Sequence, residues 1–128
     1  MDDINNLTQR IIGAAMKVHT ALGPGLLESA YEVCLAHELT KQNILVETQV
    51  LLPVLYDGIK IDAGYRMDMV VDRKVVVELK AVESIKELHK AQVLSYLKLN
   101  RMAVGLLINF NVPRLKDGIV QLVNKLQD

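Results

Sequence analysis

The segment from Tyr65 to Ala81 combines an almost continuous apolar run with three charged side chains in its interior. Its sequence, YRMDMVVDRKVVVELKA, favours two short buried strands joined by a polar turn. The charges that these strands would bury belong to Asp68, Glu78 and Lys80. Because an isolated buried charge is strongly unfavourable, each of them needs a partner or a bound cation.

The length of the turn decides which of these charges share a face of the sheet. Glu78 and Lys80 lie on one face, because residues two apart in a strand point to the same side. A three-residue turn, Asp72-Arg73-Lys74, places Asp68 across from Glu78 on that face, whereas a two-residue turn would place Asp68 on the opposite face. A shared face would allow two carboxylates and an ammonium to hold a divalent metal beside a proton donor or charge stabiliser.

The composition indicates one globular domain, residues 1–128, with 51% hydrophobic and 23% charged residues. Fifteen basic residues balance fifteen acidic ones, so net charge gives no argument for nucleic acid, although a local patch is compatible with it. The single cysteine, Cys34, fits a reducing compartment. The polar start MDDINN does not resemble a secretory signal, and no apolar run approaches the roughly 20 residues of a membrane span. We therefore expect a cytoplasmic protein that is not in a membrane.

The first part of the chain has helical periodicity. It predicts a helix over residues 4–22, ended by Gly23-Pro24, and a second helix from Pro24 or Gly25 to about Lys41. Glu28 falls in the first turn of that second helix, where a carboxylate interacts favourably with the helix dipole. On residue type alone, this interaction is sufficient to explain Glu28.

From Ile44 the period becomes extended. A strand over residues 44–54 contains Pro53, which indicates an edge position. Asp57-Gly58 is typical of a two-residue hairpin turn. A second strand over residues 59–71, interrupted at Ala63-Gly64, and a third over residues 74–80 complete an antiparallel meander.

The last part of the chain alternates helix and strand. Ser84 to Glu87 matches a capping box, which predicts a helix from Ser84 to about Asn100. In that helix Gln92 and Tyr96 lie beside one stripe, formed by Leu88, Ala91, Ser95 and Leu99. Residues 101–109 predict a strand covered on both faces and paired in parallel. A final helix follows Pro113, with an apolar face of Leu115, Ile119, Leu122, Val123 and Leu126. The order α-α-β-β-β-α-β-α predicts a mixed sheet with packed helices, in the α/β or α+β class.

This order and five short motifs resemble the PD-(D/E)XK nuclease superfamily, whose core is α-β-β-β-α-β; here a helix is added at each end. Met67 stands where the superfamily has the proline of Pro-Asp. A closer resemblance is to the small family named after its motif GxxExxY. The motifs that carry it are Gly25 to Tyr31, Arg66-Met67-Asp68, Val77-Glu78-Leu79-Lys80, the set His89, Gln92 and Tyr96, and Gly105 to Phe110.

The resemblance implies metal-dependent hydrolysis of phosphodiester bonds in nucleic acid, DNA rather than RNA. Asp68, Glu78 and the carbonyl of Leu79 would hold Mg²⁺ or Mn²⁺, which prefer oxygen ligands. Glu28 would be a further ligand, through water. Lys80 would position or deprotonate the attacking water, or stabilise the charge on the phosphate. The residues implied to orient the site or contact the phosphate are Gln92, His89 and Arg66.

Simpler interpretations stay open for several of these residues. Asp68, Glu78 and Lys80 could form an ionic cluster without catalysis, His89 could be a surface residue, and Arg66 could pair with Glu78. Asn109 fits better as a partner of backbone groups at a strand end than as a metal ligand. The main alternative function is a binding or accessory module that keeps the nuclease fold without turnover, which the neutral net charge favours. A homodimer would place two sites on one duplex.

Overall fold

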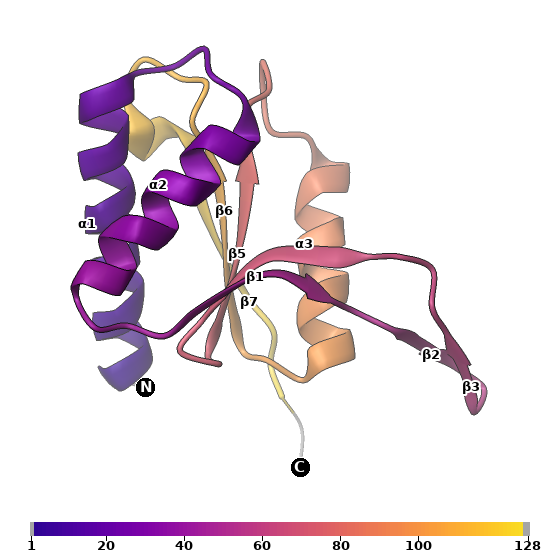
Figure 1. Ribbon diagram of the computed structural model, residues 1–128. Coiled ribbons are helices and arrows are strands. Elements are labelled where there is room, and N and C mark those ends of the chain that lie inside the picture. The colour runs from indigo at the N-terminus through magenta and orange to yellow at the C-terminus, as the bar shows by residue number, and fades with distance from the viewer. Residues whose placement is uncertain (1, 127–128) are drawn as a thin grey trace.

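The computed structural model describes residues 2–126, which form three α-helices, a five-stranded sheet and a separate two-stranded hairpin (Figure 1). No helix within these residues is both long and apolar enough to span a membrane. The elements in chain order are α1 (Asp2–Leu22), α2 (Glu28–Lys41), β1 (Val46–Leu51), β2 (Val54–Tyr56), β3 (Ile59–Ile61), β4 (Arg66–Val71), β5 (Val75–Lys80), α3 (Glu87–Asn100), β6 (Val104–Asn109), the 3₁₀ helix η1 (Leu115–Gly118) and β7 (Ile119–Val123).

The main sheet has the strand order β1-β4-β5-β6-β7 and is mixed. Strands β1, β4 and β5 pair antiparallel, as the predicted meander requires, and α3 carries the chain over to β6, which pairs parallel to β5. Every residue of β6 is buried, which confirms the prediction of a strand covered on both faces. Helices α1 and α2 lie on one side of the sheet and α3 on the other (Figure 1). The fold is therefore the predicted mixed sheet between layers of helices.

The turn between β4 and β5 is three residues long, which is the alternative that places Asp68 on the same face as Glu78. Val71 pairs with Val75, and both Asp72 and Arg73 have left-handed backbone conformations, with φ of 53° and 54°. The pairs continue through Met69 and Val77. This register brings Asp68 next to Glu78 at the far ends of the two strands.

The β2–β3 hairpin turns at Asp57-Gly58, as predicted. Both turn residues have positive φ, 49° and 76°, which is the backbone pattern of a type I′ turn. The two strands pair only with each other and project away from the main sheet (Figure 1). The extended region before Asp68 is thus divided into two elements, with an irregular stretch of residues 62–65 between them.

The predicted C-terminal helix is wrong. Residues 115–118 form a single 3₁₀ turn, and β7 pairs antiparallel with β6 at the edge of the sheet. Gly118 leaves no room for a side chain, because a Cβ there would collide with the carbonyl oxygen of Asn109. The β-branched residues that follow, Ile119 and Val120, favour a strand. The open edge of β6 offers them hydrogen bonds along its whole length, and this tertiary pairing outweighs the helical spacing of the apolar residues.

The predicted helix start at Ser84 is also wrong. Helix α3 begins at Glu87, after an extended Lys86. The backbone N–H of Lys86 donates to Nδ1 of His89 over 2.9 Å, so the acceptor that caps this end comes from a histidine inside the first turn. The cap therefore uses the side chain of His89 in place of the serine.

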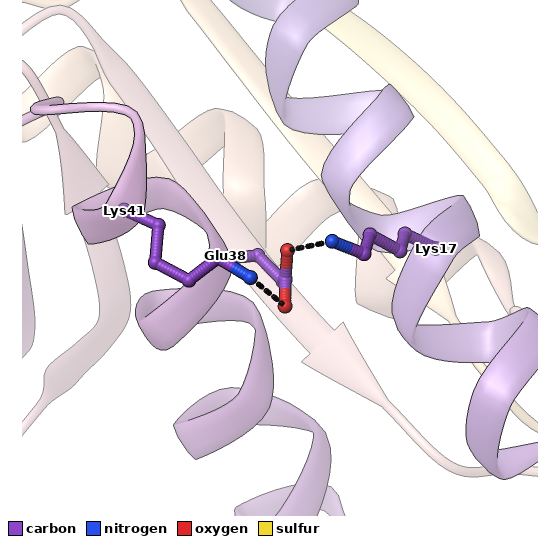
Figure 2. A network of polar contacts seen from close by, with 3 residues as sticks. All are labelled: Lys17, Glu38 and Lys41. Carbon is purple, nitrogen blue, oxygen red and sulfur yellow. Dashed lines mark hydrogen bonds and ion pairs between the residues drawn. The ribbon is translucent and has the colours of Figure 1, made fainter.

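Helices α1 and α2 are joined by a small charge network at the protein surface. The Glu38 carboxylate lies between the ammonium groups of Lys17, at 2.9 Å, and Lys41, at 3.3 Å (Figure 2). The hydrogen bond from Lys17 is the first cause that lowers the pKa of Glu38. This network adds a surface contact to the apolar packing that holds α2, the helix that carries Glu28, against α1.

Helix α3 approaches the sheet closely at Gly105 of β6. A Cβ at this position would lie 2.9 Å from Cγ1 of Val93 and 3.4 Å from Cδ1 of Leu97. Both side chains are buried on α3. The missing side chain of Gly105 therefore sets how near α3 lies to β6.

Candidate active site at the fork between β4 and β5

Asp68 and Glu78 join the ends of β4 and β5 through their side chains. The backbone N–H of Asp68 donates to Oε1 of Glu78 over 2.9 Å, and the N–H of Leu79 donates to Oδ2 of Asp68 over 2.9 Å. The backbone ladder between these strands reaches only the pair Met69–Val77. Beyond that pair the strands separate, and carboxylate oxygens take the place of carbonyl acceptors. We call this place the acidic fork.

Glu78 is almost fully buried, with 4% of its surface exposed. Its pKa is raised from 4.5 to about 8, first because burial penalises the charged form and next because the charge of Asp68 is close. The backbone N–H of Asp68 and the ammonium of Lys80 oppose this shift, while a hydrogen bond with the Asp68 side chain adds to it. Glu78 therefore does not ionise easily at the fork without a further positive charge.

Lys80 is half-buried at the end of β5 and acts on Glu78 through its charge. Strand alternation puts Glu78 and Lys80 on the α3 side of the sheet, together with Val76. Within residues 2–126, no ion pair of 4 Å or less joins Lys80 to Asp68 or Glu78. The ammonium group is therefore near the fork without being locked to either carboxylate.

Alternation along β4 breaks at Asp68. Met67 packs in the core on the α3 side, whereas Met69, two residues later, packs on the side of α1 and α2. Across β1, Thr48 pairs with Met69 and Val50 with Met67. Gln49, which falls between these pairs, has a left-handed φ of 53°. Strands β1 and β4 are therefore both irregular at the position of Asp68. This irregularity gives the Asp68 carboxylate access to both sides of the sheet.

A cavity of about 260 Å³ opens beside the fork on the α2 side. Its lining residues are Glu28, Ser29, Glu32, Gln49, Asp68 and Leu79. The Oε2 atom of Glu28 accepts a hydrogen bond from the N–H of Ala81 at 3.3 Å, directly after Lys80. The structure thus brings Glu28 and Asp68 to one cavity, whereas Glu78 and Lys80 are not among its lining residues.

Glu32 is an acidic residue of this cavity that the sequence analysis missed. Its Oε1 accepts a hydrogen bond from Nε2 of Gln49 over 2.8 Å. Burial is the first cause that raises the pKa of Glu32, the bond from Gln49 lowers it, and the charge of Asp68 raises it again. The available signal was spacing: Glu32 comes four residues after Glu28, so both carboxylates lie on one face of α2.

Tyr31, the last residue of the Gly25-to-Tyr31 motif, supports the loop that precedes Glu28. Its hydroxyl donates to the carbonyl of Gly23 over 2.6 Å and accepts from the N–H of Leu26 over 3.1 Å. Its ring stacks on Phe110, with centroids 4.4 Å apart. Tyr31 is therefore a core residue with a satisfied hydroxyl, and it fixes the start of α2.

Gln92 and His89 lie at a second cavity, of about 640 Å³, on the α3 side of the sheet. Tyr96 also lines it and is buried. The pKa of Tyr96 is raised first by burial and then by the charges of Glu78, Asp68 and Tyr65, while a hydrogen bond with Gln92 lowers it. The polar residues of α3 therefore approach the fork from the side opposite to Glu28 and Glu32.

Arg66 and Asn109 make other contacts. The exposed Arg66 donates from Nη1 to the carbonyl of Gln49 over 3.5 Å, and within the described residues it forms no ion pair with Glu78. Asn109 is buried and binds backbone: its Oδ1 accepts from the N–H of Val82, and its Nδ2 donates to the carbonyl of Val82. The preferred interpretation of Asn109 as a partner of backbone groups is confirmed.

The donor set at the fork suits a hard divalent cation. The side chains nearest to one another carry carboxylate oxygens, the ligands that Mg²⁺ and Mn²⁺ prefer, and Mg²⁺ commonly uses only one or two carboxylates and keeps several waters. Within residues 2–126, no three side chains of His, Cys, Asp or Glu are grouped closely enough to hold a metal by themselves. The fork therefore fits a cation held by two carboxylates, a backbone carbonyl and water.

The comparisons with known proteins agree with this geometry. Residues 5–122 match the PD-(D/E)XK nuclease superfamily, whose members generally use divalent metal ions. No curated protein and no solved structure matches the chain. The match spans both helices before the sheet, the two strands of the acidic fork and α3. By this match, the chain belongs to the PD-(D/E)XK nuclease superfamily.

Proposed function

We propose that this protein is a nuclease that hydrolyses phosphodiester bonds in nucleic acid with the help of Mg²⁺ or Mn²⁺, and that residues 1–128 act as one domain. The observation that carries the proposal is the acidic fork, where two carboxyl groups meet in a buried place and the pKa of Glu78 rises to about 8. Strongly shifted acid groups at such a place are typical of functional sites. DNA as the substrate, and the GxxExxY family, rest on the resemblance in the motifs.

A divalent ion bound here would supply a water of lowered pKa and positive charge next to the phosphate. Asp68, Glu78 and the carbonyl of Leu79 would hold it, and Glu28 would contribute through water. The hydrogen bonds from the backbone N–H groups use Oδ2 of Asp68 and Oε1 of Glu78, so the other oxygen of each group could bind the cation. Binding would favour the ionised form of Glu78, which burial disfavours.

The remaining polar residues would act on the substrate. Lys80 would position the attacking water, take its proton, or stabilise the negative charge that develops on the phosphate. Its freedom from a close ion pair supports this role. Gln92 would orient the site from α3, and His89 and Arg66 would contact phosphate, His89 after giving up its bond to the N–H of Lys86 or from its other ring nitrogen.

The alternative is a binding or accessory module that keeps the fold without turnover. Two observations favour it: the balance of fifteen basic and fifteen acidic residues, and the absence of a three-acid group within the described residues. The lone, half-buried Cys34 is compatible with a cytoplasmic location for either function.

A substrate screen separates the two functions. Purified protein is incubated with supercoiled, linear and branched DNA and with RNA, in Mg²⁺, Mn²⁺ or EDTA. The nuclease proposal predicts metal-dependent cleavage of at least one substrate and none by Glu78→Ala. Glu83→Ala, which removes an exposed carboxylate outside the fork, serves as the matched control and should cleave like the wild type. Binding without cleavage in every metal would support the accessory module.

A further inference from the structure

The β2–β3 hairpin carries an apolar face that no other part of residues 2–126 covers. Val54 pairs with Ile61, and Tyr56 with Ile59, so these four side chains share one face. Tyr56 is 70% exposed and Ile59 is 59% exposed. A two-stranded hairpin standing alone is marginally stable in water, and this one projects from the main sheet (Figure 1). An exposed apolar face of this kind favours a binding partner that removes it from water.

The groove along α3 continues this face. Val54 belongs to both, because it also lines the cavity of about 640 Å³. Leu88 at one end of α3 is 79% exposed, and Leu99 at the other end is 39% exposed. The predicted stripe of α3 therefore faces the groove and not the core. We call the combined area the hairpin–helix surface; its apolar members are Val54, Tyr56, Ile59, Ile61, Tyr65, Leu88 and Leu99.

The area of this surface approaches what a stable protein interface buries on each partner. With about 200 Å² for a large side chain, the exposed fractions of its members amount to roughly 600–700 Å². The largest apolar patch on a typical monomer is about 300–600 Å², and a stable complex buries about 800 Å² on each partner. Two exposed residues of the same stripe of α3, Ala91 and Ser95, would supply the rest.

The charges near the surface give no excess of cations. The hairpin and α3 together carry Asp57, Asp62 and Glu87 against Lys60, Lys90 and Lys98, whereas a nucleic-acid surface needs an excess of cations that replace the counterions of phosphate. The shape favours a second copy of the chain. A projecting apolar face and an apolar groove occur on the same molecule, so one two-fold axis can seat each hairpin in the groove of the other copy.

We propose that the protein forms a symmetric dimer in which the β2–β3 hairpin of each copy packs along α3 of the other. This proposal does not depend on the nuclease function. The acidic fork takes no part in the contact, so a catalytically inactive chain would form the same dimer.

Sedimentation velocity over a range of micromolar concentrations tests the dimer. The wild type should sediment as a dimer, and Ile59→Lys and Leu88→Glu should each raise the dissociation constant by more than about tenfold, because a charge is buried without a partner. Val33→Lys changes an apolar residue that is 68% exposed on α2, outside the surface, and should dimerise like the wild type. Circular dichroism establishes that each variant is folded.

Mixing the two disrupted variants tests the crossed arrangement. In a mixed dimer, Lys at position 59 of one copy faces Glu at position 88 of the other, and the second contact is wild type on both sides. Association should therefore recover in the mixture. A monomeric wild type, dimerisation unaffected by either variant, or no recovery on mixing would each overturn the proposal. Loss of nucleic-acid binding by Leu88→Glu in a monomeric protein would assign the surface to substrate instead.

Discussion

Asp68 and Glu78 hold adjacent strands together where the backbone ladder between those strands has ended. Glu78 accepts a hydrogen bond from the N–H of Asp68, and Asp68 accepts one from the N–H of Leu79, each over 2.9 Å. The two acids are therefore structural and, in our proposal, metal-binding at the same time. This double role makes opposite predictions for stability with and without metal.

The first prediction concerns pH and stability. In the folded protein the pKa of Glu78 is about 8, against 4.5 for the unperturbed group, so between these values the folded state binds more protons than the unfolded chain. Stability without metal should fall as the pH rises through this range, by at most about 1.4 kcal/mol per pH unit. Glu78→Gln removes the titration, so this variant should be more stable than the wild type near pH 8.

Urea denaturation across this pH range, in EDTA, measures the effect. The advantage of Glu78→Gln should shrink as the pH is lowered toward 4.5, because wild-type Glu78 then carries its proton. Glu83→Gln, a change of an exposed carboxylate, gives the baseline for removing one acid. A constant difference between wild type and Glu78→Gln at all pH values would show that Glu78 does not titrate in this range.

The second prediction concerns metal binding. Asp68→Asn keeps a side-chain oxygen as acceptor for the N–H of Leu79 but loses the charge. Its affinity for Mn²⁺ should fall by at least about tenfold, the scale on which even an outer-shell partner acts. Calorimetric titration of wild type, Asp68→Asn and Glu83→Gln is the measurement. Equal Mn²⁺ affinity in all three would exclude a metal site at the fork.

The third prediction separates the nuclease from the accessory module. Lys80→Ala should keep metal binding and substrate affinity nearly unchanged and lower single-turnover cleavage by about 100-fold or more, the usual scale for a lost proton-transfer or charge-stabilising group. Lys80→Arg should restore only part of the rate, because a guanidinium is larger and does not lose its proton near neutral pH. Cleavage by Lys80→Ala at the wild-type rate would leave Lys80 as a counter-charge to Glu78.

The fourth prediction concerns Tyr31. Tyr31→Phe keeps the stacking on Phe110 and removes the hydroxyl that serves Gly23 and Leu26, so it should cost about 1–3 kcal/mol of unfolding free energy. Glu83→Gln is the control, because Glu83 is exposed and lies outside the fork and the hairpin–helix surface. Equal unfolding midpoints for the two variants would mean that the hydroxyl of Tyr31 does not stabilise the loop before Glu28.

The sequence limited the pairing of Asp68 and Glu78 to two registers because the geometry of the acidic fork is local. Two strands and a three-residue turn determine the register of Asp68 and Glu78, and alternation in β5 then determines the face of Lys80. Glu28 could be assigned to the same place only through the motif resemblance, since a carboxylate in a first helical turn has an ordinary explanation. Its neighbour Glu32 was missed, although the spacing of four residues was visible.

The errors occurred where long-range pairing decides. The apolar spacing from Leu115 to Leu126 fits a helix. Residues 119–123 nevertheless pair with the free edge of β6 and form β7. The stripe of α3 that includes Leu88 and Leu99 has the spacing of a core face, while the residues that are buried are Val93, Tyr96 and Leu97. Periodicity shows which side chains share a face of a helix. Packing against the sheet then determines which of these faces is buried.

Gly105 connects the core to the proposed chemistry. It pairs with Val76 of β5, two residues before Glu78, and α3 rests on it through Val93 and Leu97. A methyl group at position 105 would move Val93 away by a few tenths of an ångström, and α3 would carry Gln92 with it while Glu78 stayed in the sheet. The alignment of residues around a bound phosphate would then change although no polar group had been lost. Sensitivity of catalysis to substitution would thus extend to a position that never meets the substrate.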